Sequence, residues 1–256
     1  MTGEMRIADY LAAGGKLTAP DNAPPRYRAE LLRLMATFVD STLAGAAGFA
    51  DTINAGPGIP ERIAAARIVM EKTRNAGHVL ALMGDFGADT GRYVGNHPWG
   101  ARLSRAADIG ARRGDHDMRL AVFNYPLQGW DDAVVMNLLM GHAAVIQLRD
   151  LERVSYQPLA RLFGEIAPVE TRHRDLAAAG VTRRHEQGAD RGALQQSVDY
   201  WWPRVAVSFG GASAERQALL AAFGLRHATG ADQLAEWSRT AAAALDGLGL
   251  VAPASA

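Results

Sequence analysis

The sequence predicts an all-α fold: a four-helix bundle with a helical C-terminal extension. Three observations lead to this prediction. Apolar residues recur at spacings of three and four along several long segments, which is the pattern of helices with one buried face. Alternating and β-branched runs, which mark strands, are scarce. The chain has 256 residues, of which 48% are hydrophobic, so it can bury a sizeable core.

The chain opens with a segment, residues 1–25, that is rich in Ala, Gly and Pro and is expected to be flexible. A helical domain should then span residues 26–256. Its first long helix begins at Arg26 and is expected to end before the glycine-containing stretch GAAGFAD. The second runs from Pro60, a residue that suits the first turn of a helix, to about Phe86. The stretch GRYVGNHPWG is predicted to be a loop, followed by a short helix over residues 99–111.

The third and fourth long helices are predicted over residues 130–154 and 155–179. Pro168 should interrupt the fourth helix, because proline cannot donate a backbone hydrogen bond. The C-terminal extension begins near residue 190 and is expected to hold three helices, over residues 191–208, 213–224 and 231–248. Trp201 and Trp202 are expected to anchor this extension on the bundle.

Composition excludes several classes of function. The 27 basic residues are balanced by 27 acidic ones, whereas nucleic-acid-binding proteins normally carry a basic excess. The lack of cysteine excludes disulfides, thiolate catalysis and iron–sulfur clusters. No apolar run reaches the roughly 18 residues that a membrane-spanning helix needs. The first residues do not read as a signal peptide, so a cytoplasmic protein is expected.

The tetrapeptide ETRH at residues 170–173 has the spacing of a metal-binding pair. Residues three apart share a helix face, so Glu170 and His173 can bind one ion together, although a solvated helix face is the plainer interpretation. The second long helix offers His78, preceded by Asn75 where a ligand pair would have Glu. Glu71, one turn earlier, either substitutes for that glutamate or is a surface charge.

Five sequence blocks, taken in their order and spacing, carry a family resemblance. The blocks are DSTLAGAAGF from Asp40, AGPGIPERIAAARIV leading into NAGH, SYQPLARLFGEIAPVETRH, DYWWPRVAVSFG and LGLVAP. The chain resembles the phenylacetic-acid catabolic protein family, and within it the catalytic A subunits of ring-epoxidising phenylacetyl-CoA monooxygenases. The resemblance covers about residues 26–252 and implies a ferritin-like bundle in which carboxylates from four helices bridge two irons. It also implies an aryl- or acyl-CoA ligand and a related ferritin-like chain as partner in a homo- or hetero-oligomer.

Carried over position by position, the resemblance implies a degenerate di-iron site. The positions at which the family has its ligands are occupied, in helix order, by Thr42, by Asn75 with His78, by Gly141, and by Glu170 with His173. Only the last pair is intact, and His142 adjoins the third position. Two irons carry at least four positive charges, and burying them without compensating carboxylates is costly. An intact di-iron centre is therefore not expected.

Three functional hypotheses follow. The first is a non-catalytic subunit that keeps the bundle and pairs with a related chain. The second is a divergent non-haem oxygenase or hydroxylase, in which His78, Glu170 and His173 hold one Fe or other divalent metal as a facial triad. The third is a helical interaction protein unrelated to oxygenases. A basic cluster of Arg112, Arg113 and Arg119 could bind a CoA phosphate, although neighbouring aspartates favour a solvated loop.

Overall fold

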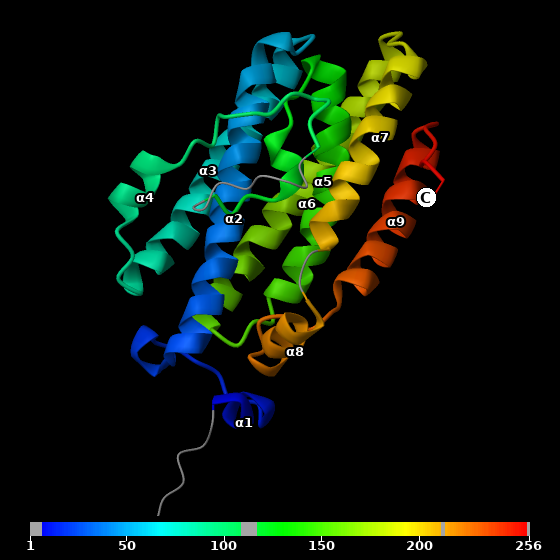
Figure 1. Ribbon diagram of the computed structural model, residues 1–256. Helices are drawn as coiled ribbons and strands as arrows, with labels where there is room; N and C mark the ends of the chain where they lie inside the picture. Colours follow the sequence, from blue (N-terminus) through cyan, green and yellow to red (C-terminus); the bar gives the residue numbers. More distant parts are fainter. Residues whose placement is uncertain (1–6, 109–116, 211–212, 255–256) are drawn as a thin grey trace, which may run out of the picture.

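The computed structural model describes residues 7–108, 117–210 and 213–254, and within these ranges its regular secondary structure is helical (Figure 1). The elements, in chain order, are α1 (Ile7–Ala12), the short 3₁₀ turn η1 (Pro20–Asn22), α2 (Pro25–Thr52), η2 (Ile53–Ala55), α3 (Ile59–Asp85), α4 (Thr90–Asn96), η4 (Ala121–Asn124), α5 (Gly129–Leu151), α6 (Gln157–Glu186), α7 (Arg191–Ala206), η5 (Val207–Phe209), α8 (Ala214–Ala222) and α9 (Gly230–Gly247). The prediction of an all-α, ferritin-like bundle is confirmed. In the described part of the chain, no helix is both long and apolar enough to cross a membrane.

Two helical hairpins form the bundle. Helix α2 packs along α3, and α5 packs along α6, while α3 and α6 join the two hairpins. Helices α2 and α5 touch much less, so a groove remains between them. Helices α7 and α9 lie on the outer side of α5, where they form the predicted C-terminal extension (Figure 1).

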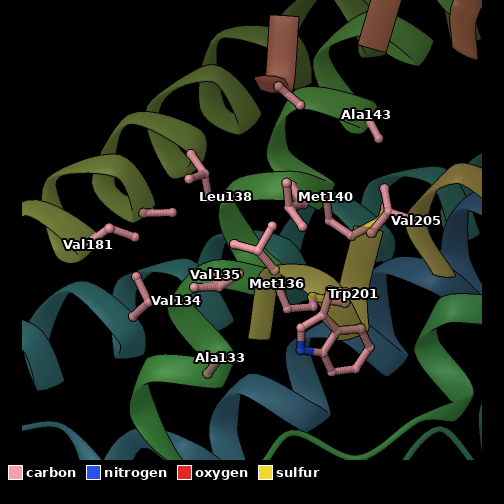
Figure 2. Close-up of a cluster of buried hydrophobic side chains, with 14 of the residues drawn as sticks. Ala133, Val134, Val135, Met136, Leu138, Met140, Ala143, Val181, Trp201 and Val205 are labelled. Carbon is pink, nitrogen blue, oxygen red and sulfur yellow. The ribbon is translucent and has the colours of Figure 1, made fainter. Parts of the chain in front are cut away.

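Helix α5 is the centre of the core because apolar residues surround it on nearly every side. Figure 2 shows its side chains between Val181 of α6 and the α7 residues Trp201 and Val205. Fully burying an aliphatic or aromatic side chain contributes about 1.5–3 kcal/mol, so this cluster stabilises the bundle and its extension together. Trp201 also donates its indole hydrogen to Asp132 of α5 at 2.9 Å, and Trp202 packs on Trp237 of α9. Trp201 therefore anchors the extension on the bundle, as expected, whereas the ring contact of Trp202 joins α7 to α9 within the extension.

The first long helix does not end before GAAGFAD but continues as α2 to Thr52. The glycines serve close packing instead of breaking the helix. A Cβ atom on Gly45 would lie 2.9 Å from the ring of Phe123, and one on Gly48 would lie 3.0 Å from the Arg102 guanidinium. The prediction that these glycines end the helix is therefore wrong. Their lack of a side chain leaves space for Phe123 and Arg102, which pack against α2.

The region after α3 also differs from the prediction. GRYVGNHPWG is not wholly a loop, since its first six residues lie in α4, which ends at Asn96. The Asp89 carboxylate caps this helix by accepting from the Arg92 backbone amide. The helix expected at 99–111 is missing from its described part, residues 99–108. Guanidinium groups hold this stretch in an irregular conformation instead. Arg119 donates to the Pro98 and Ala101 carbonyls, and Arg102 donates to the Ala44 carbonyl of α2.

Arg119 is only 2% exposed, and its guanidinium is occupied by Asp117 and by backbone carbonyls. It is therefore not available for a CoA phosphate, whereas Arg112 and Arg113 lie outside the described residues. At the other end of the chain, α6 continues through Pro168 and beyond the predicted end to Glu186. The residue four positions before Pro168 is the exposed Gly164, so the backbone hydrogen bond that proline cannot make is missing on the solvent side.

Part of the N-terminal segment has defined structure. It contains α1 and η1, and Leu17 is buried and pairs with Tyr156 in an isolated β-bridge at the start of α6. At the same end of the bundle, the Tyr27 and Ser155 hydroxyls lie 2.8 Å apart. These contacts fix where α6 begins, and so they fix the register of the face that carries Glu170 and His173.

Candidate functional site

Helices α3 and α6 bring together three buried side chains, the half-buried Lys72 and the exposed Arg172. Glu71 and Lys72 come from α3, and Glu170, Arg172 and His173 come from α6. Glu170 and His173 lie three residues apart and share a face, as the spacing predicts. Glu71 is buried opposite them, so its interpretation as a surface charge is wrong.

The imidazole of His173 lies between two glutamates. Its Nε2 atom is 2.7 Å from Oε2 of Glu71, and its Nδ1 atom is 3.5 Å from Oε1 of Glu170. The other oxygen of each glutamate receives a cationic donor. Lys72 Nζ donates to Oε2 of Glu170 at 2.6 Å, and Arg172 Nη2 donates to Oε1 of Glu71 at 2.9 Å. We call these five residues the Lys72–Glu170 cluster.

The electrostatics of the cluster favour ionised glutamates. Burial alone would raise the pKa of Glu170, but the charge of Lys72 and the nearby His173 imidazole outweigh it and lower this pKa to about 2. Burial opposes ionisation of Glu71 as well, and contacts with His173 and Arg172 again lower its pKa. Two carboxylates thus face two permanent cations, and the cluster is electrically balanced by side chains alone.

This donor set does not fit a di-iron centre. Among the described residues, no group of three or more His, Asp or Glu side chains is arranged to hold a metal ion. The glutamate oxygens that would face an ion already accept from Lys72, Arg172 and His173. An ammonium group 2.6 Å from Glu170 would also repel a cation placed beside that carboxylate.

The structure does not bring His78 to Glu170 and His173. His78 is exposed on the outer side of α3, whereas the other two side chains are buried. Asn75 does face the interior, and its Nδ2 atom is buried without a hydrogen-bond partner among the described residues. An amide donor in this place cannot act as a metal ligand through nitrogen. The proposed triad is therefore not assembled in this conformation.

The remaining predicted ligand positions, Thr42 and Gly141, carry no carboxylate. Thr42 lines the groove between α2 and α5. At Gly141, an added Cβ would lie 2.8 Å from Cβ of Arg174, so α5 and α6 are too close for a larger side chain. His142 does not enter the cluster, and its electrostatic neighbours are Arg174 and Asp175. Within α5, all of which the structure describes, no carboxylate joins the cluster in place of the missing one.

A cavity of about 210 Å³ lies along the groove between α2 and α5. Its walls are largely apolar, with Phe38 and Phe49 from α2 and Met140 from α5, and Lys72 and Glu170 also line it. Asn137 lines the cavity too, is 8% exposed, and has an Nδ2 atom without a partner in the described structure. A ligand with an apolar body and a hydrogen-bond acceptor would match this lining.

Sequence reasoning missed the role of Lys72. One signal could have pointed to it: only two lysines, Lys16 and Lys72, stand among the 27 basic residues, and one of them immediately follows Glu71. The compact ammonium of lysine reaches a buried carboxylate as a point charge, whereas the planar guanidinium that the chain uses elsewhere needs more room.

Comparison with known proteins gives two findings. The model of the phenylacetic acid catabolic protein family matches residues 5–256. The chain is also 26% identical, over 214 residues, to the A subunit of the 1,2-phenylacetyl-CoA epoxidase of Escherichia coli (strain K12). That match covers 79% of this chain and 62% of the relative, so the chain spans less than two thirds of the relative's length.

Proposed function

The chain belongs to the phenylacetic acid catabolic protein family, and from this premise we propose that it is a non-catalytic, ferritin-like subunit of an oxygenase system for aryl- or acyl-CoA thioesters. The observation that carries the proposal is the ion pair between Lys72 and Glu170. In this proposal the ammonium group supplies the positive charge that a metal would otherwise provide. The bundle then keeps its shape without iron, since its stability depends on apolar packing.

A partner chain follows from the proposal. A subunit without its own metal contributes to oxygenation only if a related ferritin-like chain supplies the metal site. The relative in Escherichia coli is named as one subunit of an epoxidase, which supports an assembly of several chains. We therefore propose a hetero-oligomer in which this chain has a binding or supporting role.

The groove supports a ligand-binding role. Its apolar walls suit an aryl or acyl group, and the unpaired Nδ2 atom of Asn137 suits a thioester carbonyl oxygen. Arg33 also lines the groove, is exposed, and forms no ion pair with a carboxylate in the described part of the chain. Its guanidinium is therefore available for a CoA phosphate.

Two measurements test the proposal. Phenylacetyl-CoA binding to the purified chain should be measurable by calorimetry, and Asn137→Leu should weaken it about tenfold, the worth of one hydrogen bond. Asn54→Leu, at an exposed position outside the groove, is the matched control and should leave binding unchanged. The chain alone, given ferrous iron, a reductant, O2 and phenylacetyl-CoA, should form no oxygenated thioester. Such a product would contradict the non-catalytic role. A lack of phenylacetyl-CoA binding would contradict the proposal that the groove binds a CoA thioester.

A further inference from the structure

The outer face of α3 carries an exposed seam with coiled-coil spacing. Its residues follow one another at intervals of four, three, four, three and four: Ile59, Ile63, Ala66, Met70, Thr73 and Gly77. The large apolar members are unusually open to solvent, since Ile59 is 75%, Ile63 57% and Met70 61% exposed. Alternating intervals of three and four are those at which one helix meets another in a coiled coil. We call these six residues the α3 seam.

The seam has a basic edge. Arg67 and Arg74 lie seven residues apart, so they stand on the same side of the seam, and both are exposed. Neither forms an ion pair with a carboxylate within the described part of the chain. The two glutamates in this part of α3 do not neutralise these arginines. Glu61 is buried and pairs with Arg183, and Glu71 pairs with His173 in the Lys72–Glu170 cluster.

The opposite edge offers no acidic residue either. Arg62 stands there and donates to the backbone carbonyls of Gly56 and Asn54. The exposed positions from Ile59 to His78 are therefore apolar, neutral or basic. Nothing on α3 itself neutralises Arg67 and Arg74.

The charges argue against a second copy of this chain on the seam. In an antiparallel pair of α3 helices, Arg67 and Arg74 would face the same arginines of the other copy. In a parallel pair, they would face the edge that carries Arg62, Val69 and Ala76. Neither arrangement supplies a carboxylate, and like charges directly across a helix interface are destabilising.

We propose that the α3 seam binds an amphipathic helix of a different protein chain, apolar at heptad spacing and acidic along one edge. The apolar stripe would cover Ile59, Ile63 and Met70, and the small Ala66 and Gly77 would let the two helices approach closely. Acidic side chains on the partner helix would pair with Arg67 and Arg74. The seam residues and the two arginines are exposed and none of them belongs to the Lys72–Glu170 cluster, so the inference does not depend on the proposed function.

The experiment uses the full chain and two synthetic helical peptides of about three heptads. Both peptides have leucine along the seam; one has glutamate at the flanking positions and the other has lysine. Repulsion between like charges keeps each peptide from pairing with itself. Fluorescence anisotropy of the labelled peptides, titrated with the chain at low salt, should show the glutamate peptide binding at least about tenfold more tightly than the lysine peptide.

Three variants make the test specific. Arg67→Glu with Arg74→Glu should reverse the preference between the peptides, and Met70→Glu should abolish binding of both while the melting temperature stays unchanged. Arg161→Glu, at an exposed position on α6, is the control and should change nothing. Equal binding of the two peptides, or no binding of either, would overturn the proposal. So would self-association of the chain that Met70→Glu disrupts, because the occupant would then be a second copy.

Discussion

The ammonium group of Lys72 lies 2.6 Å from Oε2 of Glu170, so a side chain of the protein itself neutralises a buried glutamate. Glu170 is 4% exposed, and the cationic side chain comes from the helix opposite. A buried ion pair of this kind leaves each member dependent on the other, because losing one partner strands a charge in the interior.

Replacing Lys72 by Met should therefore destabilise the protein. We expect the free energy of unfolding to fall by about 3 kcal/mol, because Glu170 would remain buried without a counter-charge. Urea denaturation followed by circular dichroism measures this change. Lys72→Arg keeps the positive charge, so its free energy of unfolding should fall by clearly less than that of Lys72→Met. The double variant Lys72→Met with Glu170→Gln should recover much of the loss, and strict additivity of the two single changes would contradict the pairing.

Gly141 should not tolerate even a methyl group. A Cβ atom there would lie 2.8 Å from Cβ of Arg174, so Gly141→Ala should force α5 and α6 apart and lower the free energy of unfolding by about 1–3 kcal/mol. Gly164→Ala is the matched control, since that glycine is exposed within α6 and nothing lies within 4 Å of its added Cβ. The control should be stabilised by about 0.5–1 kcal/mol. Equal effects of the two substitutions would show that the helices are not in close contact at Gly141.

Asp132 should be essential for docking the C-terminal extension. Its carboxylate accepts from the Trp201 indole, the Gln128 amide and both terminal nitrogens of Arg105. Asp132→Ala should lower the free energy of unfolding by about 3 kcal/mol, because these buried donors would lose their acceptor. The neighbouring Asp131→Ala, which breaks a partly exposed pair with Arg184, should cost less than about 1 kcal/mol. Both values come from the same urea titrations.

Stability should fall on mild acidification, in part because of His142. Burial, together with the charge of Arg174, lowers the pKa of His142 from 6.5 to about 4. Between these values the unfolded chain takes up a proton that the folded chain does not, so the free energy of unfolding decreases as the pH drops from 6.5 towards 4. Between about pH 7.5 and 5, the wild type should lose about 2 kcal/mol more of its free energy of unfolding than His142→Gln. Identical pH profiles for the two proteins would contradict a buried neutral imidazole.

Much of the fold could be predicted from the sequence, because the buried faces of α3, α5 and α6 repeat at helical spacing. The misjudged parts depend on tertiary contacts. Gly45 and Gly48 resemble helix breakers until Phe123 and Arg102 are known to lie against them. The irregular stretch at 99–108 is held by arginines whose partners are backbone carbonyls, and a sequence pattern does not specify such partners.

The candidate site could be predicted only in part. The spacing of Glu170 and His173 correctly places both on the interior face of α6. The orientation of Glu71 was ambiguous, because Lys72 and Arg74 beside it suggest a surface. The ion pair between Lys72 and Glu170 could not be predicted from the sequence, because it depends on how α3 and α6 pack together and the two residues are 98 positions apart.

The most direct test of the balanced Lys72–Glu170 cluster is the iron content of the purified chain. The protein should be produced in iron-supplemented medium, then incubated anaerobically with excess ferrous iron and desalted before mass spectrometry of the metal. We expect far less than one iron per chain, with no change in melting temperature on adding iron. Two tightly bound irons per chain, retained through desalting, would contradict it.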